Sequence, residues 1–187
     1  MRLDELHRRA VEAWQARVDA VRQDQWSAAT PCAEWDVRAL VNHVVGEELW
    51  TSPLVEGSTI EEVGDRFDGD VLGGAPTEAA RSAAQAAATT VDERLSEGGI
   101  AHLSYADVPI EEYVHQLTAD HLIHGWDLAA ATGQSRQLDP DLVTEVAAWF
   151  ADRESMYREG GAIGPRVETG GDAQDDLLAR FGRDPSW

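Results

Sequence analysis

Lysine is absent from this 187-residue chain, so all 15 of its positively charged residues are arginines. The chain also carries 35 acidic residues, and its formal net charge at pH 7 is −20. Nucleic-acid backbones and anionic lipid surfaces are bound through basic protein surfaces. The charge therefore argues against nucleic acid and membranes as partners, and it leaves small molecules open.

Cysteine and long apolar runs are equally scarce. Cys32 is the only cysteine, so no intrachain disulfide can form, which fits a reducing compartment. No apolar run approaches the roughly 20 residues that span a bilayer. Residues 1–9 are charged where a signal peptide would need an apolar core. We therefore expect a soluble, cytoplasmic protein.

The remaining composition is typical of a globular protein, with 43% hydrophobic and 27% charged residues. Apolar residues recur at spacings of three and four, which predicts amphipathic helices. The predicted helices are residues 3–22, 37–54, 77–95, 110–131 and 140–157, with a shorter one at 173–181. No long segment alternates as a strand would, so the chain is predicted to be all-α.

The connections indicate how these helices are joined. Residues 56–76 are rich in glycine and acidic residues, and they are long enough for a crossover connection in a helical bundle. Residues 101–108 fit either a short strand or an extended turn. We expect one domain over residues 1–187, in which 1–133 form the core bundle and 134–187 form a C-terminal helical extension.

Two predicted helices each carry an acidic residue and a histidine one turn apart. Asp120 and His124 lie about 40° from each other around the helix axis, on the border of its apolar face. His43 and Glu47 form the same kind of pair in the second helix. Side chains at this spacing project from one helical face. Two such helices in a bundle indicate a divalent metal site.

Other interpretations of these residues remain open at this stage. The pairs also fit solvated or salt-bridged groups at the edge of the core. His121 lies about 100° from Asp120 around the helix and competes with His124 as a ligand. Cys32 fits either a nucleophile near a helix start or a packed turn. Three protein ligands would leave an ion one open position for water, a thiolate or a substrate, as in catalytic sites.

Three segments together resemble a known family. They are residues 30–46, residues 124–133 (His-Gly-Trp-Asp-Leu-Ala-Ala-Ala-Thr-Gly) and residues 177–187, which end in Gly-Arg-Asp-Pro-Ser-Trp. The first two are similar to signatures of the DinB-like, mycothiol-dependent maleylpyruvate isomerase family, and the third is similar to the tail of one of its branches. The resemblance extends over nearly the whole chain.

The resemblance implies a fold and a set of ligands. It implies a DinB-like four-helix bundle with a long crossover, extended here by C-terminal helices, and a divalent metal ion, zinc first and nickel as the alternative. The ligand positions fall on His43, Asp120 and His124, where Asp120 replaces the family's glutamate with a side chain one methylene shorter. Glu47 and His121 are additional candidates, and Asp127 is expected to support the site structurally or by contacting a ligand.

The resemblance also implies a chemistry. Relatives use the metal to bind the thiolate of a low-molecular-weight thiol such as mycothiol, which attacks a small-molecule electrophile. Nothing after Gly133 resembles the isomerases' separate C-terminal domain, which favours a thiol S-transferase over an isomerase. The alternative is a non-catalytic DinB-like metal-binding or stress-associated bundle. Relatives often pair through their helices, which makes a homodimer one open alternative for the oligomeric state.

Overall fold

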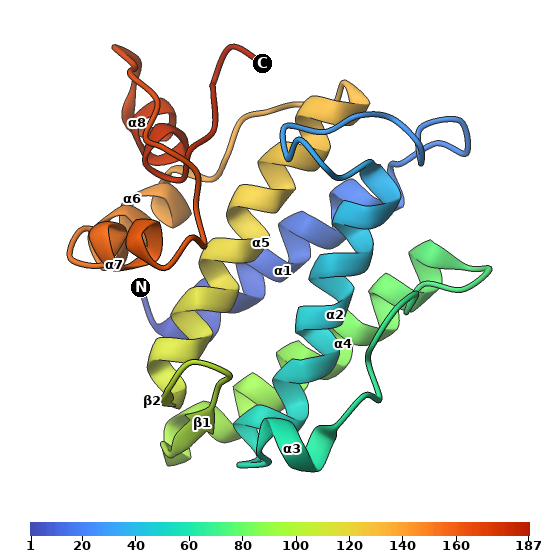
Figure 1. The fold of residues 1–187 in the computed structure, drawn as a ribbon, viewed down its shortest axis with the longest axis vertical. Helices are drawn as coiled ribbons and strands as arrows, with labels where there is room; N and C mark the ends of the chain where they lie inside the picture. The colour runs from blue at the N-terminus through green and yellow to red at the C-terminus, as the bar shows by residue number, and fades with distance from the viewer.

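Four long helices form the body of the protein in the computed structural model, which describes residues 1–187. They are α1 (Leu3–Asp19), α2 (Val37–Val55), α4 (Pro76–Arg94) and α5 (Ile110–Thr132). Helix α1 packs along α5, and α2 packs along both α4 and α5 (Figure 1). The all-α prediction is confirmed, since the only sheet is one short hairpin. None of the helices is both long enough and apolar enough to cross a membrane.

Local signals in the sequence set the ends of these helices. The side chain of Asp36 accepts a hydrogen bond from the Ala39 backbone N–H, which caps the start of α2. Pro76 occupies the first turn of α4, where its missing N–H has no cost. Helix α5 ends at Gly133, whose φ of 71° lies in the left-handed region that favours glycine.

The long connection between α2 and α4 carries the chain back along the bundle (Figure 1). It contains one short helix, α3 (Ile60–Val63), which the periodicity did not predict. Thr59 and Glu62 form a reciprocal capping box at its start. Asn42 on α2 holds the later part of the connection through its bonds with the Gly69 carbonyl and the Val71 N–H.

Between α4 and α5 the chain forms a 3-10 turn (Leu95–Glu97) and a two-stranded hairpin. Strand β1 (Ile100–His102) pairs antiparallel with β2 (Asp107–Pro109), and Ala101 lies opposite Val108. Of the two interpretations of residues 101–108, the structure therefore shows strands.

The C-terminal residues form three shorter helices that pack on α5 on the side away from α2 and α4 (Figure 1). They are α6 (Pro140–Phe150), α7 (Glu154–Glu159) and α8 (Ala173–Arg180). The single helix predicted for residues 140–157 is therefore wrong, because residues 151–153 form a turn. The turn lets Tyr157 pack edge-to-face on Phe150 with ring centroids 5.5 Å apart. Tertiary packing of aromatic rings thus overrides a helical pattern here.

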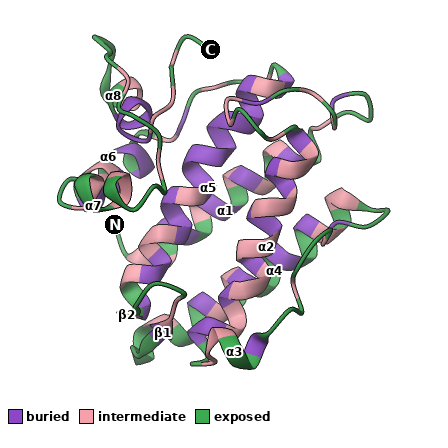
Figure 2. Cartoon of the chain, in the orientation of Figure 1, coloured by how far each residue is buried: buried purple, intermediate pink, exposed green.

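Helix α5 is the central element of the fold, and most of its residues are buried (Figure 2). One face packs with α1 and the C-terminal helices, where Trp126 is 1% exposed. The ring of Trp126 also lies under the Arg136 guanidinium, 5.9 Å from its centroid. Trp126 therefore packs against other elements, away from the face of α5 that carries Asp120 and His124. Helix α5 lies between the rest of the four-helix bundle and the C-terminal extension, so its polar side chains lie at the boundary between these two parts.

Candidate metal centre

Three of the predicted ligands come together where α2 meets α5. His43 Nε2 lies 3.5 Å from Asp120 Oδ2, and His124 Nε2 lies 3.3 Å from Asp120 Oδ1. The rings of the two histidines are 5.1 Å apart. Within this group one ligand atom from each residue lies within 4.8 Å of the others. The helical spacing of Asp120 and His124 and the packing of α2 on α5 produce this arrangement.

The donor set and its spacing fit a divalent ion. Zinc binds imidazole nitrogen and carboxylate oxygen at roughly 2.0–2.2 Å, so neighbouring ligands of a tetrahedral ion are about 3.3 Å apart. The two contacts to Asp120 are close to that separation. In addition, Asp120 Oδ2 is buried and has no hydrogen-bond partner. Because a buried carboxylate oxygen without a partner is costly, an ion at this position would resolve the cost.

Asp127 orients one of the histidines. Its Oδ2 accepts a hydrogen bond from His124 Nδ1 at 3.0 Å, one turn along α5. A carboxylate only accepts, so the proton of the neutral imidazole is on Nδ1. The lone pair is therefore on Nε2, which faces Asp120 and His43. Metal-binding histidines commonly have such a carboxylate behind them.

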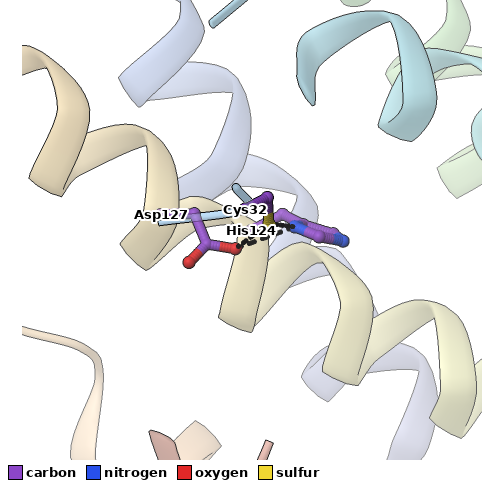
Figure 3. Close-up of side chains that lie close together, drawn as sticks. All are labelled: Cys32, His124 and Asp127. Carbon is purple, nitrogen blue, oxygen red and sulfur yellow. Dashed lines mark hydrogen bonds and ion pairs between the residues drawn. The ribbon is translucent and has the colours of Figure 1, made fainter. Parts of the chain in front are cut away.

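A second group of potential ligands lies on the opposite side of the His124 ring (Figure 3). Cys32 Sγ is 3.3 Å from Asp127 Oδ2 and 4.0 Å from His124 Nδ1. Arg183 from the C-terminal tail donates to both residues, with Nη2 3.1 Å from Cys32 Sγ and 2.9 Å from Asp127 Oδ2. Because the guanidinium already supplies a positive charge there, the group on the His43 side is the better candidate for a metal site.

The hydrogen bonds of Cys32 also bear on its two interpretations. Thr30 Oγ1 accepts from the Cys32 N–H at 3.1 Å, and it donates to the Trp35 carbonyl at 2.8 Å. The thiol thus sits in a fixed turn and joins that turn to α5 and to the C-terminal tail. This arrangement favours the packed-turn interpretation.

In the metal-free protein, the charges around His124 keep a proton on its imidazole. Burial lowers the pKa of His124, but Asp120 and Asp127 outweigh burial, and the pKa lies well above its usual value. Burial raises the pKa of Asp120, but His124 and His43 outweigh it and bring the pKa well below its usual range. A metal ion must therefore displace a proton from His124 to bind.

Glu47 and His121, the additional candidates, differ in placement. Glu47 lines the same pocket as the cluster, and its pKa is raised by burial and by the nearby Asp120. His121 points elsewhere, since its Nε2 lies 3.1 Å from Glu48 Oε1 and its Nδ1 lies 2.6 Å from the Leu117 carbonyl. The structure thus brings Glu47 to the site and engages both nitrogens of His121 in the bundle core.

A pocket of about 690 Å³ opens beside the cluster. Trp35 covers one side, with its ring 4.7 Å from that of His43. Five further residues line the pocket that the sequence pattern did not predict, namely Tyr113 on α5 and Trp149, Tyr157, Phe181 and Arg183 in the C-terminal extension. Phe181 and Arg183 had a signal, since both belong to the tail motif of residues 177–187. The aromatic residues have no common spacing that would group them.

A four-helix bundle with a long crossover, with a histidine on one helix and an acid–histidine pair on another, is the architecture of a DinB-like protein. The chain belongs to the mycothiol maleylpyruvate isomerase N-terminal domain family, whose model matches residues 7–129. It is also similar to two uncharacterised proteins from two strains of Mycobacterium tuberculosis. Each is 38% identical over 150 residues, which cover 76% of this chain and 74% of the relative. No solved structure matches the chain.

Proposed function

We propose that this protein binds one divalent metal ion, zinc or alternatively nickel, through His43, Asp120 and His124. We further propose that it uses the ion for mycothiol-type thiol S-transfer. One observation carries the proposal, namely that the two-helix cluster faces a pocket of about 690 Å³. A site with three protein ligands beside such a space leaves room for a thiol and an electrophile.

When bound, the ion would stabilise the thiolate form of the cofactor thiol at neutral pH. Two carboxyl groups of the chain would support this ionisation. Asp127 keeps the Nδ1 proton of His124 in place, so that Nε2 faces the cluster. Glu47 presents a carboxyl group with a raised pKa in the same pocket, where it can accept the proton that the thiol releases. The thiolate then forms a bond to the electrophilic carbon as the leaving group departs.

Glu47 also supports a second candidate function. If its carboxylate completed the coordination of the ion, the site would hold four protein ligands and would be closed, as structural sites are. The protein would then be a non-catalytic metal-binding or stress-associated bundle. The Glu47→Gln variant separates the two functions. An open catalytic site keeps its metal and loses rate in this variant, whereas a closed site loses metal affinity.

The test of the transfer function is a conjugation assay with mycothiol and a chlorobimane, in which the sulfur displaces chloride. We expect an enzyme-dependent rate only when both zinc and mycothiol are supplied, and we expect it to be lost in His124→Ala. The control is His102→Ala on β1, outside the pocket, where His102 contacts Asp107 at 2.8 Å. Metal-loaded protein without any rate above the uncatalysed reaction, across a panel of thiols and electrophiles, would contradict catalysis.

A further inference from the structure

We propose that the electrophile that this pocket accepts is an uncharged and largely apolar, aromatic molecule, and that the C-terminal extension selects it. This inference names the substrate class of the proposed thiol transfer and rests on that function. It follows from the walls of the pocket, from the absence of a free cation among its lining residues, and from two unpartnered hydroxyl groups.

The two sides of the pocket differ in chemistry. The bundle supplies all the polar groups of the cluster, together with Glu47 and apolar residues of α5 such as Leu117 and Ile123. The extension supplies a mainly apolar set, namely Trp149, Tyr157, Ile163 and Phe181. These four apolar or aromatic side chains belong to, or pack against, the hydrophobic core shared by α5 and the C-terminal helices. Phe181 stacks on Phe150 with ring centroids 4.0 Å apart. The extension therefore forms a fixed apolar wall of the pocket that also holds the cluster.

Arg183 is the only arginine that lines the pocket, and its charge is already paired with that of Asp127. Its Nε and Nη2 groups contact both carboxylate oxygens of Asp127, and its Nη1 donates to the Phe181 carbonyl. Asp127 is fully buried, and the Arg183 side chain is 14% exposed. A carboxylate on a substrate would therefore have to break a buried ion pair to reach this guanidinium.

The other charged groups of the pocket disfavour anions as well. Glu34, Glu47 and Asp120 line it. The two positive charges of a bound divalent ion would be offset by Asp120 and by the incoming thiolate. A substrate carboxylate would thus meet the carboxyl groups of Glu34 and Glu47 and no free counter-charge, and such a desolvated charge is strongly disfavoured.

Two tyrosine hydroxyl groups indicate which polar group the substrate would carry. Tyr113 and Tyr157 both line the pocket, and each has a buried hydroxyl without a hydrogen-bond partner. Thr51 is a polar neighbour of Tyr113, but it makes no hydrogen bond of normal geometry with it. Burial raises the pKa of both tyrosines, so both remain donors at neutral pH. Such donors suit a neutral acceptor, for example a carbonyl, nitro or epoxide oxygen.

Binding of matched unreactive probes tests the inference without metal or thiol. We expect metal-free protein to bind dinitrobenzene at least about tenfold more tightly than dinitrobenzoate in equilibrium dialysis. Ile163→Arg places a cation on the apolar wall and should reduce that preference about tenfold, whereas the uncharged control Ile163→Gln should retain most of it. Equal or tighter binding of dinitrobenzoate by the unmodified protein would overturn the inference, even if Ile163→Arg failed to fold.

Turnover separates this inference from the proposed function. With zinc and mycothiol, the thiolate sulfur forms a bond to the ring carbon of chlorodinitrobenzene that carries chlorine. The carbon–chlorine bond breaks, and chloride leaves. We expect this neutral substrate to react faster than chlorodinitrobenzoate. A binding preference for the neutral probe without turnover of either substrate would overturn the transfer function and support the selectivity of the pocket. Faster turnover of the benzoate would overturn the selectivity and support the transfer function.

Discussion

Replacing Arg183 with methionine is expected to destabilise the protein strongly, although the residue lies only four positions before Trp187. Arg183 contacts Asp127 through Nη2 at 2.9 Å and through Nε at 3.2 Å. The Asp127 side chain is fully buried, whereas that of Arg183 is 14% exposed. Methionine fills a similar volume but leaves the Asp127 carboxylate with only the imidazole of His124 as a charged partner.

The magnitude follows from the burial. Removing one partner of a buried ion pair costs roughly 3–5 kcal/mol, because the other charge stays desolvated. Since Arg183 is slightly exposed, we expect the lower end, about 3 kcal/mol. In a chain of this length that change lowers Tm by about 6–12 °C. Burial raises the pKa of Asp127, but His124 and Arg183 outweigh it, so the carboxyl is ionised in the native state at neutral pH.

The assay is urea unfolding of metal-free protein at pH 7, with chelator present so that metal binding does not contribute. The matched control is Arg81→Met, which removes exposed ion pairs with Asp19 and Glu78 and should cost less than about 1 kcal/mol. The double variant Arg183→Met/Asp127→Asn should cost less than the sum of its single changes. A loss below about 1 kcal/mol in Arg183→Met would refute the assignment of a buried, stabilising pair.

Two further predictions concern protons. Because the pKa of His124 is raised in the metal-free protein, metal binding at neutral pH should release about one proton and should weaken as pH falls. Calorimetry in buffers of different ionisation enthalpy measures this release, and its absence would contradict the charge state of His124. Burial lowers the pKa of His7 from 6.5 to about 3, so the unfolded chain binds a proton there that the folded protein does not. Stability should therefore fall as pH decreases from 6.5 toward 3, by up to about 5 kcal/mol, and His7→Leu should flatten that dependence in acid unfolding curves. An unchanged pH dependence in His7→Leu would contradict a buried neutral imidazole.

The bundle was predictable because its signals are local. Apolar spacing placed the four long helices, and Asp36 and Gly133 marked two of their ends. Local spacing also places Asp120 and His124 on one face of α5, whereas their approach to His43 depends on the packing of α2 against α5. Their role as ligands remains a prediction.

The remaining features depend on contacts between distant parts of the chain. Arg183 is separated by 56 positions from Asp127 and by 151 from Cys32, so no spacing pattern links them. The turn after Phe150 forms because aromatic rings pack across it, which a helical pattern does not register. His121 has Glu48 as its partner in the core, 73 positions away. Helical periodicity predicted which face of α5 His121 occupies, but it did not predict that Glu48 is its partner.

Metal content is the most direct test of the proposed centre. Tag-free protein, His124→Ala and the control His102→Ala should be reconstituted with zinc or nickel and analysed by inductively coupled plasma mass spectrometry. We predict about one ion per chain in the unmodified protein and in His102→Ala, and almost none in His124→Ala. Unmodified protein that holds no metal after reconstitution, or His124→Ala that holds as much as the unmodified protein, would contradict a centre formed by His43, Asp120 and His124.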